Sequence, residues 1–253
     1  MLYQLLFLCY LTITLPHPIT SARKPDRLRL PSSRQDETVF CESWRFSVET
    51  NDAGNWTVVP SRCKNFVRTY MTGPRYQSDT YFAAEPALSF VRGLNGSGDG
   101  LDAWIFSVDD TLISCLPYYE LHGFGSEEFN EASFYEWAST ADAPPIAASW
   151  TLYKELQARE FTIFILSGRH EHFRDITETN LISAGYTHYK RLILRSESDN
   201  GKLATDYKSI KRKEIVDEGY TIRGISGDQW SDLLGNSVAQ RSFKLPNIMY
   251  YIP

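Results

Sequence analysis

Four short apolar runs, each separated from the next by sequence long enough for a helix, constrain the fold of this chain more than any other feature. They read DAWIFSV (102–108), FTIFILS (161–167), YKRLILR (189–195) and IRGISGD (222–228). The stretches SWTLYKELQARE (149–160) and YKSIKRKEIVDEG (207–219) repeat apolar residues at helical spacing. This alternation predicts an α/β fold: a doubly wound, mostly parallel sheet with helices on both faces.

The sequence before the first run predicts an N-terminal extension and two small elements. Residues 23–38 are polar and contain prolines, so we expect a flexible arm that precedes one domain over residues 39–253. Apolar residues alternate between 39 and 60, which predicts a hairpin with NDAGN (51–55) as its turn. The helical spacing of Ala84, Leu88 and Val91 predicts a helix before the first strand.

The chain start indicates the secretory pathway. Residues 1–22 combine a short apolar run, prolines and small residues, which is typical of a signal peptide and too short for a membrane span. We therefore expect secretion or a vacuole, with no membrane attachment after the signal is removed. The net charge of -5 gives no basic surface for nucleic acid. Two glycosylation sequons fit this route, at Asn55 and Asn95.

Three cysteines remain once the signal peptide and Cys9 are removed. An odd number in an oxidising compartment predicts one disulfide and one free thiol. We expect Cys41 to pair with Cys63, closing a loop of about twenty residues that contributes about 3 kcal/mol. Cys115 is expected to be a buried thiol without a catalytic role.

Polar residues follow three of the apolar runs, where a parallel sheet of this kind places its ligands. The acids Asp109, Asp110, Asp228 and Asp232 follow two of the runs, and Mg²⁺ is one reason to gather carboxylates. The alternative is that these acids cap turns and helices.

The second run ends in Ser167, Gly168 and Arg169, which suit either a phosphate site or a helix cap. Lys208, with Lys211, Arg212 and Lys213 behind it, offers positive charge for a phosphoryl group or simply forms a solvated helix face.

The order SVDDT, LSGR, YKSIKR and GDQWSD resembles the four motifs of the haloacid dehalogenase-like phosphohydrolases. The flanking LPYYELHGFG, FYEWASTADAPP and RSFKLPNIMYYIP are similar to subfamily IIIB, the plant acid phosphatases and vegetative storage proteins. This resemblance implies an acid/base at Asp109 and a phosphate site at Ser167, Gly168 and Lys208. It implies a Mg²⁺ site made by the Asp109 main-chain carbonyl and Asp228, with Asp232 behind. The position of the family's nucleophilic Asp holds Ser107.

Ser107 decides between three functional hypotheses. A serine hydroxyl must lose a proton before it attacks phosphorus. Having Ser instead of Asp at this position also removes a carboxylate ligand of Mg²⁺. We therefore expect weakened or lost Mg²⁺ binding, little or no phosphomonoesterase activity and a storage role. The alternatives are an active, Mg-dependent acid phosphatase acting on phosphate monoesters, and a protein that binds phosphate or a small phosphate ester. The resemblance also makes a homodimer plausible.

Overall fold

The computed structural model describes residues 36–253. The expected signal peptide (1–22) and most of the expected arm (23–38) lie outside the described residues. Helix α1 (Glu37–Glu49), which the sequence did not predict, begins after Asp36, whose side chain accepts a hydrogen bond from the Thr38 backbone N–H at 2.7 Å. Such a cap satisfies one of the free donors at a helix start.

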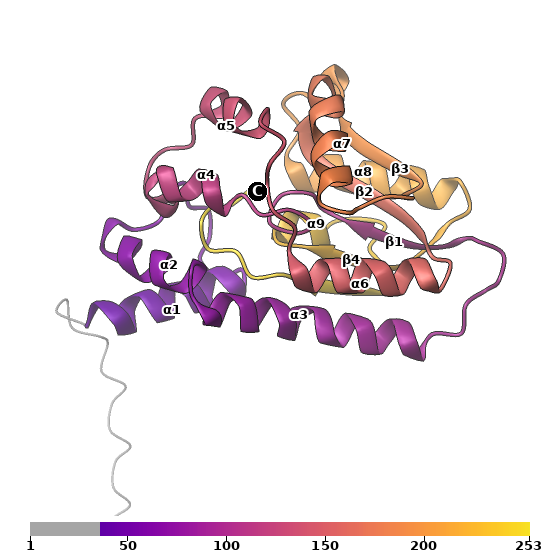
Figure 1. Ribbon diagram of the computed structural model, residues 1–253, viewed down its shortest axis with the longest axis horizontal. Helices are drawn as coiled ribbons and strands as arrows, with labels where there is room; N and C mark the ends of the chain where they lie inside the picture. The colour runs from indigo at the N-terminus through magenta and orange to yellow at the C-terminus, as the bar shows by residue number, and fades with distance from the viewer. Residues whose placement is uncertain (1–35) are drawn as a thin grey trace, which may run out of the picture. The chain divides into compact units, whose positions relative to one another are not determined.

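A five-stranded parallel sheet forms the centre of this unit (Figure 1). The four apolar runs correspond to its first four strands in the chain, as predicted. The strands are β1 (Asp102–Phe106), β2 (Thr162–His170), β3 (Arg191–Arg195), β4 (Thr221–Gly227) and β5 (Arg241–Lys244). Their order across the sheet is β3-β2-β1-β4-β5, so the doubly wound topology is confirmed. The short β5 was not anticipated.

Helices cover both faces of the sheet because successive side chains on a strand point to opposite sides. On β1, Trp104 belongs to one buried cluster that includes residues of α3, α6 and α7, whereas Ile105 belongs to another that includes Tyr207 of α8. The helices are α3 (Pro74–Gly93), α6 (Ala147–Ala158), α7 (Arg174–Ser183), α8 (Ala204–Asp217) and α9 (Trp230–Leu233). The predicted helices around Leu88, Leu152 and Ile215 are therefore present.

A third buried cluster lies beyond the carboxyl end of β1. It joins α1 and the disulfide to Met249 near the C-terminus, and Figure 1 shows its helices on the side toward which β1 runs. Its other helices are α2 (Lys64–Met71), α4 (Leu116–Leu121) and α5 (Glu131–Ala138). Four short 3-10 helices complete the described elements: η1 (Ser61–Cys63), η2 (Gly123–Gly125), η3 (Glu171–Phe173) and η4 (Glu197–Asp199).

The hairpin predicted over residues 39–60 is wrong. Most of its first half belongs to α1, because Cys41, Trp44 and Val48 recur at helical spacing and pack into the third cluster. Val39 and Phe46, which contributed to the apparent alternation, are 48% and 65% exposed. The NDAGN segment does form a turn after the helix, and it leads into the disulfide between Cys41 and Cys63.

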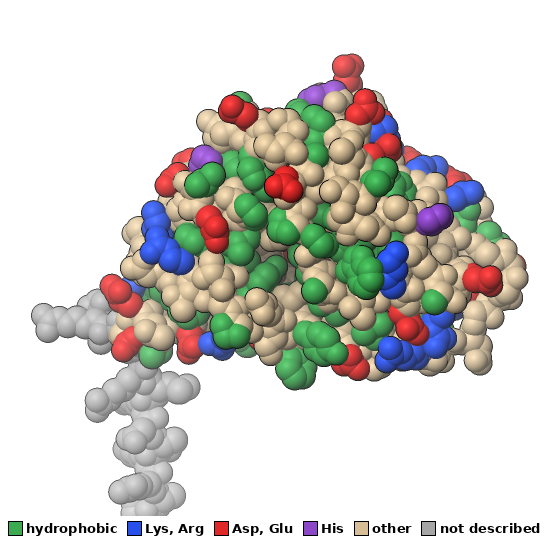
Figure 2. All heavy atoms as spheres, viewed as in Figure 1, with side chains coloured by type: hydrophobic (Ala, Val, Ile, Leu, Met, Phe, Trp, Pro, Cys, Tyr) green, Lys and Arg blue, Asp and Glu red, His purple; other side chains and the backbone are tan. Residues whose placement is uncertain are grey.

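Acidic and basic side chains are interspersed on the face shown in Figure 2, so this face carries no continuous basic surface. Over residues 36–253, no helix combines the length and the apolar character that a membrane crossing requires.

Candidate functional site

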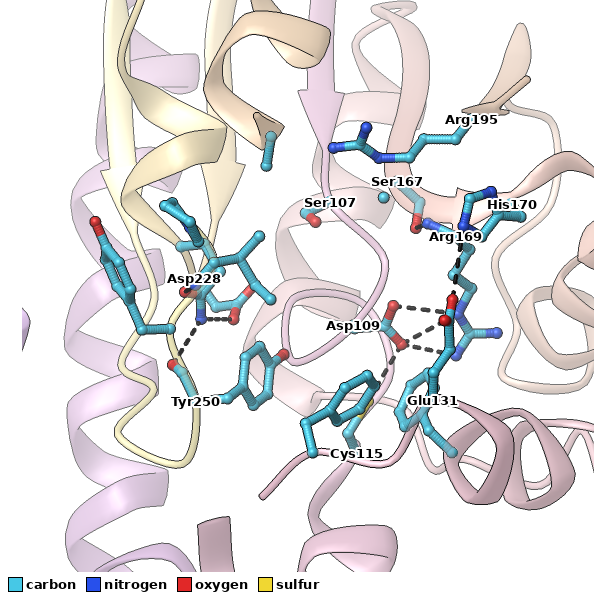
Figure 3. Close-up of a pocket in the computed structure, with 18 of the residues that line it drawn as sticks. Ser107, Asp109, Cys115, Glu131, Ser167, Arg169, His170, Arg195, Asp228 and Tyr250 are labelled. Atoms are coloured by element: carbon cyan, nitrogen blue, oxygen red, sulfur yellow. Dashed lines mark hydrogen bonds and ion pairs between the residues drawn. The ribbon is translucent and has the colours of Figure 1, made fainter. Parts of the chain in front are cut away.

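The carboxyl ends of the strands open into a cavity of about 730 Å³ (Figure 3). Ser107 and Asp109 follow β1, Ser167 lies on β2 and Asp228 follows β4. Lys208 reaches the same cavity from α8. Together with Gly168, these residues chosen from the sequence thus line one cavity, as expected for strand ends in an open α/β sheet.

Ser107 occupies the end of the central strand. Its backbone N–H donates to the Ser226 carbonyl on β4 at 3.1 Å, which extends the pairing of the two strands by one residue. The side chain faces the cavity (Figure 3), and Ser107 is 8% exposed. No described residue forms a hydrogen bond with its hydroxyl group. The hydroxyl therefore has no neighbouring base that already holds its proton.

The carboxylate of Asp109 is held by Arg169. Arg169 Nη2 donates to Asp109 Oδ1 at 2.7 Å, and Arg169 Nε donates to Oδ2 at 3.1 Å. The Arg169 side chain is only 3% exposed, against 22% for Asp109. The carboxylate of Asp109 raises the pKa of Arg169 against the opposing effect of burial. This bidentate pair fixes the direction of Asp109 and neutralises its charge.

Cys115 also contacts Asp109, since its thiol donates to Asp109 Oδ1 at 3.2 Å. Burial, and then the charges of Asp109 and Asp110, raise the pKa of this thiol well above its usual value. Such a thiol stays protonated and is a poor nucleophile. The structure thus favours the expected role of Cys115 as a buried, unreactive thiol.

Ser167 and Gly168 differ from the sequence prediction in their local structure. They were expected at the start of a helix, but β2 continues through both to His170. The Ser167 hydroxyl accepts a hydrogen bond from the Arg169 N–H at 3.1 Å, and Ser167 is 1% exposed. Ser167 and Gly168 therefore line the cavity from a strand and not from a helix N-terminus, and the phosphate site expected at these residues stays a prediction.

Lys208 and Asp232 form a buried ion pair. Lys208 Nζ lies 2.5 Å from Asp232 Oδ1, and their side chains are 5% and 3% exposed. The other carboxylate oxygen of Asp232 accepts from the Gln229 N–H at 3.0 Å and caps α9. Asp232 does not line the cavity. It holds the lysine in place, and its expected position behind a metal ion stays a prediction.

The other basic residues on α8 do not reach the cavity. Lys211 and Lys213 pair with Glu214 and Asp217 on their own helix. Arg212 is fully buried and donates to backbone carbonyls of the α9 loop, among them that of Asp232 at 2.8 Å. Of these four basic side chains, only Lys208 is placed to meet a ligand.

The two remaining acids lie in different surroundings. Asp228 is 2% exposed and accepts from Thr111 Oγ1 at 3.1 Å and from Gln229 Nε2 and Asn247 Nδ2 at 2.8 Å each. Burial, with the nearby Asp232, raises the pKa of Asp228. Asp110 is fully buried away from the cavity, and burial together with Asp228 raises its pKa too. Asp110 thus has a structural role.

The donors available to Mg²⁺ are few. They are the Ser107 hydroxyl, the Asp109 main-chain carbonyl and the Asp228 carboxylate, of which only the last carries charge. Both oxygens of Asp228 already accept hydrogen bonds. Within residues 36–253, no group of three or more His, Cys, Asp or Glu side chains is arranged to hold a metal ion. Mg²⁺ is usually bound through one or two carboxylates together with waters or substrate phosphates, and Asp228 is the one carboxylate in this set.

Several cavity residues were not assigned roles from the sequence. Arg169 was noted only as part of the second strand end, and its pairing with Asp109 was not foreseen. Arg195 ends β3, and Trp56 and Tyr250 come from the loop after α1 and from the C-terminal segment. Only the position of Arg195 at a strand end offered a signal; the other two come from segments without regular structure.

The two sequons lie in different places. Asn55 is exposed and lines the cavity rim. Asn95 is exposed in the loop between α3 and β1, which leads into the amino end of the sheet.

Comparison with known proteins agrees with this fold. The family model described as HAD superfamily, subfamily IIIB (Acid phosphatase) matches residues 28–253. The chain therefore belongs to subfamily IIIB of the HAD superfamily, the acid phosphatases.

Its relatives include both enzymes and storage proteins. It is 43% identical to acid phosphatase 1 of Solanum lycopersicum over 90% of each chain. It is 37% identical to vegetative storage protein 2 of Arabidopsis thaliana, over 84% of this chain and 80% of the relative, and 36% identical to the stem 28 kDa glycoprotein of Glycine max, over 90% of each.

A solved structure shares the fold. The class C acid phosphatase from Bacillus anthracis superposes with a TM-score of 0.63 at 17% identity, covering 76% of this chain and 86% of that one.

Proposed function

We propose that this protein is a storage protein on an acid phosphatase scaffold, with a retained phosphate pocket and little or no phosphomonoesterase activity. One observation carries the proposal: the Ser107 hydroxyl stands at the end of the central strand without a base to take its proton. A serine becomes an effective nucleophile when an adjacent base or a metal ion activates it.

The nearby carboxylates are poorly placed for that task. Asp109 is bound by Arg169 in a bidentate pair, and Asp228 accepts three hydrogen bonds. Losing an ionised nucleophile commonly costs several powers of ten in rate, or roughly 4 to 8 kcal/mol of barrier. The residual route is attack by water with Asp109 as general base.

The serine at position 107 also affects the expected binding of Mg²⁺. The family uses Mg²⁺, but Ser107 offers a neutral oxygen where the resemblance places a carboxylate. We therefore propose that this chain binds Mg²⁺ weakly or not at all.

An active acid phosphatase is the second candidate. It is favoured by Ser167 and Lys208, which line the cavity together with Asp109. In this alternative, water replaces the missing nucleophile and the substrate is a phosphate monoester. A third candidate is a protein that binds phosphate or a small phosphate ester as a signal, using the same pocket.

The storage role and the destination rest on the relatives. Two of them are named as a vegetative storage protein and a stem glycoprotein. Storage requires solubility, stability and abundance, and it makes no demand on the nucleophile. We propose a secretory destination, either vacuole or cell exterior, and assembly as a homodimer.

The experiment is an assay of purified protein on an aryl phosphate at acidic pH, with and without MgCl₂. Ser107→Asp is compared with the natural chain and with Ser139→Asp, a matched change at an exposed serine outside the cavity. We expect a gain of at least a hundredfold for Ser107→Asp with MgCl₂, and none for the control. Robust turnover by the natural chain, equal to that of Ser107→Asp, would refute the proposal and favour the active enzyme.

A second measurement addresses storage directly. A storage protein should form a large fraction of soluble tissue protein and decline when nitrogen is withheld. A low level of the protein that stays constant with and without a nitrogen supply would contradict the storage role while leaving the enzymatic result unaffected.

A further inference from the structure

The basic side chains around the cavity differ in how their charges are balanced. Arg169 faces Asp109 at 2.7 Å, and Lys208 faces Asp232 at 2.5 Å. His170 lies 3.6 Å from a carboxylate oxygen of Glu131. Arg195 lines the same cavity, but within residues 36–253 its guanidinium group contacts backbone carbonyls and an aromatic ring and pairs with no carboxylate.

Arg195 is nevertheless held firmly. Its Nη1 donates to the backbone carbonyls of Asp199 and Lys202 at 3.1 Å each, and its guanidinium group lies 4.5 Å from the centre of the Tyr207 ring. Neutral carbonyls and a ring face orient the group without cancelling its charge. Nη2 and Nε donate to no described residue. The group is therefore fixed, charged and still able to donate.

Its direction points to a ligand. Figure 3 shows the Arg195 side chain extending from β3 toward the part of the cavity where Ser107 and Ser167 lie. The carboxylate of Asp199 does not compete for it, because that group accepts from Lys202 Nζ at 2.6 Å and from Ser196 Oγ at 2.7 Å. A fixed guanidinium fork of this kind binds carboxylate and phosphate oxygens well.

We propose that Arg195 forms a second anion subsite, so that the pocket prefers organic phosphates that carry an additional anionic group, such as a carboxylate. This inference rests on the proposed phosphate pocket and extends it by naming the class of ligand. The phosphate lies at the floor near Ser107, Ser167 and Lys208, and the second anion lies at Arg195.

The test is calorimetric titration with phenyl phosphate, 3-carboxyphenyl phosphate, 4-carboxyphenyl phosphate and inorganic phosphate. A hydrogen-bonded charge pair is expected to tighten binding of one carboxylated ester about tenfold over phenyl phosphate. In Arg195→Gln this ratio should fall to about one. Arg191→Gln is the matched control, because Arg191 lies on the same strand outside the cavity and pairs with Glu218. It should keep the natural ratio.

The outcomes are distinguishable. Binding of phenyl phosphate with no gain from either carboxylate overturns the subsite but not the proposed pocket. No binding of phenyl phosphate or inorganic phosphate overturns the pocket and the subsite together. The ratio in the natural protein tests the preference even where Arg195→Gln does not fold, and Arg195→Lys, which keeps the charge without the fork, should give an intermediate ratio. An unchanged ratio in folded Arg195→Gln would assign the preference to another residue.

Discussion

The buried ion pair between Lys208 and Asp232 should respond strongly to the loss of one partner. We expect Asp232→Asn to destabilise the protein by about 3 to 5 kcal/mol, because it leaves the Lys208 ammonium buried beside a neutral amide. The double variant Lys208→Met with Asp232→Asn should be destabilised by less than the sum of the single variants. Because Asp232 orients the Lys208 ammonium group, phosphate binding should also weaken in both single variants and in the double variant.

The magnitude follows from the geometry. At the 2.5 Å separation of the two charged atoms, an effective dielectric constant of about 20 gives a gross attraction of roughly 7 kcal/mol. Desolvation offsets much of it, since both side chains are at least nine-tenths buried. Removing one charge loses the attraction but leaves the other charge buried with its desolvation cost. A single variant should therefore lose more stability than half of the double variant's loss would suggest, and the two single losses should not add.

The assay is equilibrium urea unfolding of the natural protein, both single variants and the double variant. We expect a coupling free energy of about 2 kcal/mol or more. For a domain of this size, a loss of 3 kcal/mol corresponds to a fall in Tm of about 6 to 12 °C. Additive effects within about 0.5 kcal/mol, or a loss below about 1 kcal/mol for Asp232→Asn, would refute the reasoning. A stability gain from MgCl₂ that disappears in Asp232→Asn would instead assign this acid to a metal site.

Three further outcomes are expected. Replacing both Cys41 and Cys63 by serine should lower the unfolding free energy by about 3 kcal/mol in urea titrations, since the disulfide closes a loop with a sequence separation of 22; an unchanged midpoint would contradict this. The pKa of Asp199 is lowered to about 2, by Lys202 and Ser196 against the effect of burial. Its contribution to stability is therefore complete above pH 4 and lost as the pH falls toward 2, so Asp199→Asn should cost about 2 kcal/mol at pH 7 and flatten the acid limb of the stability profile; parallel profiles would argue against it. In protein from a secretory host, enzymatic trimming of a glycan at Asn55, on the cavity rim, should speed ligand association, whereas Asn95→Gln should not; equal rates before and after trimming would exclude a steric effect.

The sheet was predictable because its signal is local. Each of the first four strands is a short apolar run followed by a polar or turn-forming segment, and a parallel sheet with two covered faces requires such runs. The same reliance on local pattern gave the wrong prediction for residues 39–60, because the apolar residues there fit a period of two almost as well as a helical period. Tertiary packing of Cys41 and Val48 decided in favour of the helix.

The site was predictable only at the level of strand ends. The rule that ligands sit beyond the carboxyl ends of parallel strands brings Ser107, Ser167 and Asp228 into one cavity. It does not say which side chains pair across that cavity. The partnership of Asp109 with Arg169 depends on side-chain directions over a separation of 60 residues, and no local pattern encodes it.

The charges around the cavity bear on the proposed effect of Ser107 on catalysis and metal binding. Asp109 is paired with Arg169, whereas the donors to the Asp228 carboxylate are all neutral. A carboxylate at position 107 would add a second negative charge at the strand ends and would supply the nucleophile as well. The structural contact of Ser107 is made by its backbone, which pairs with Ser226 whatever the side chain. Ser107→Asp is therefore expected to leave the strand intact, so that a change in activity or in Mg²⁺ binding can be assigned to the side chain.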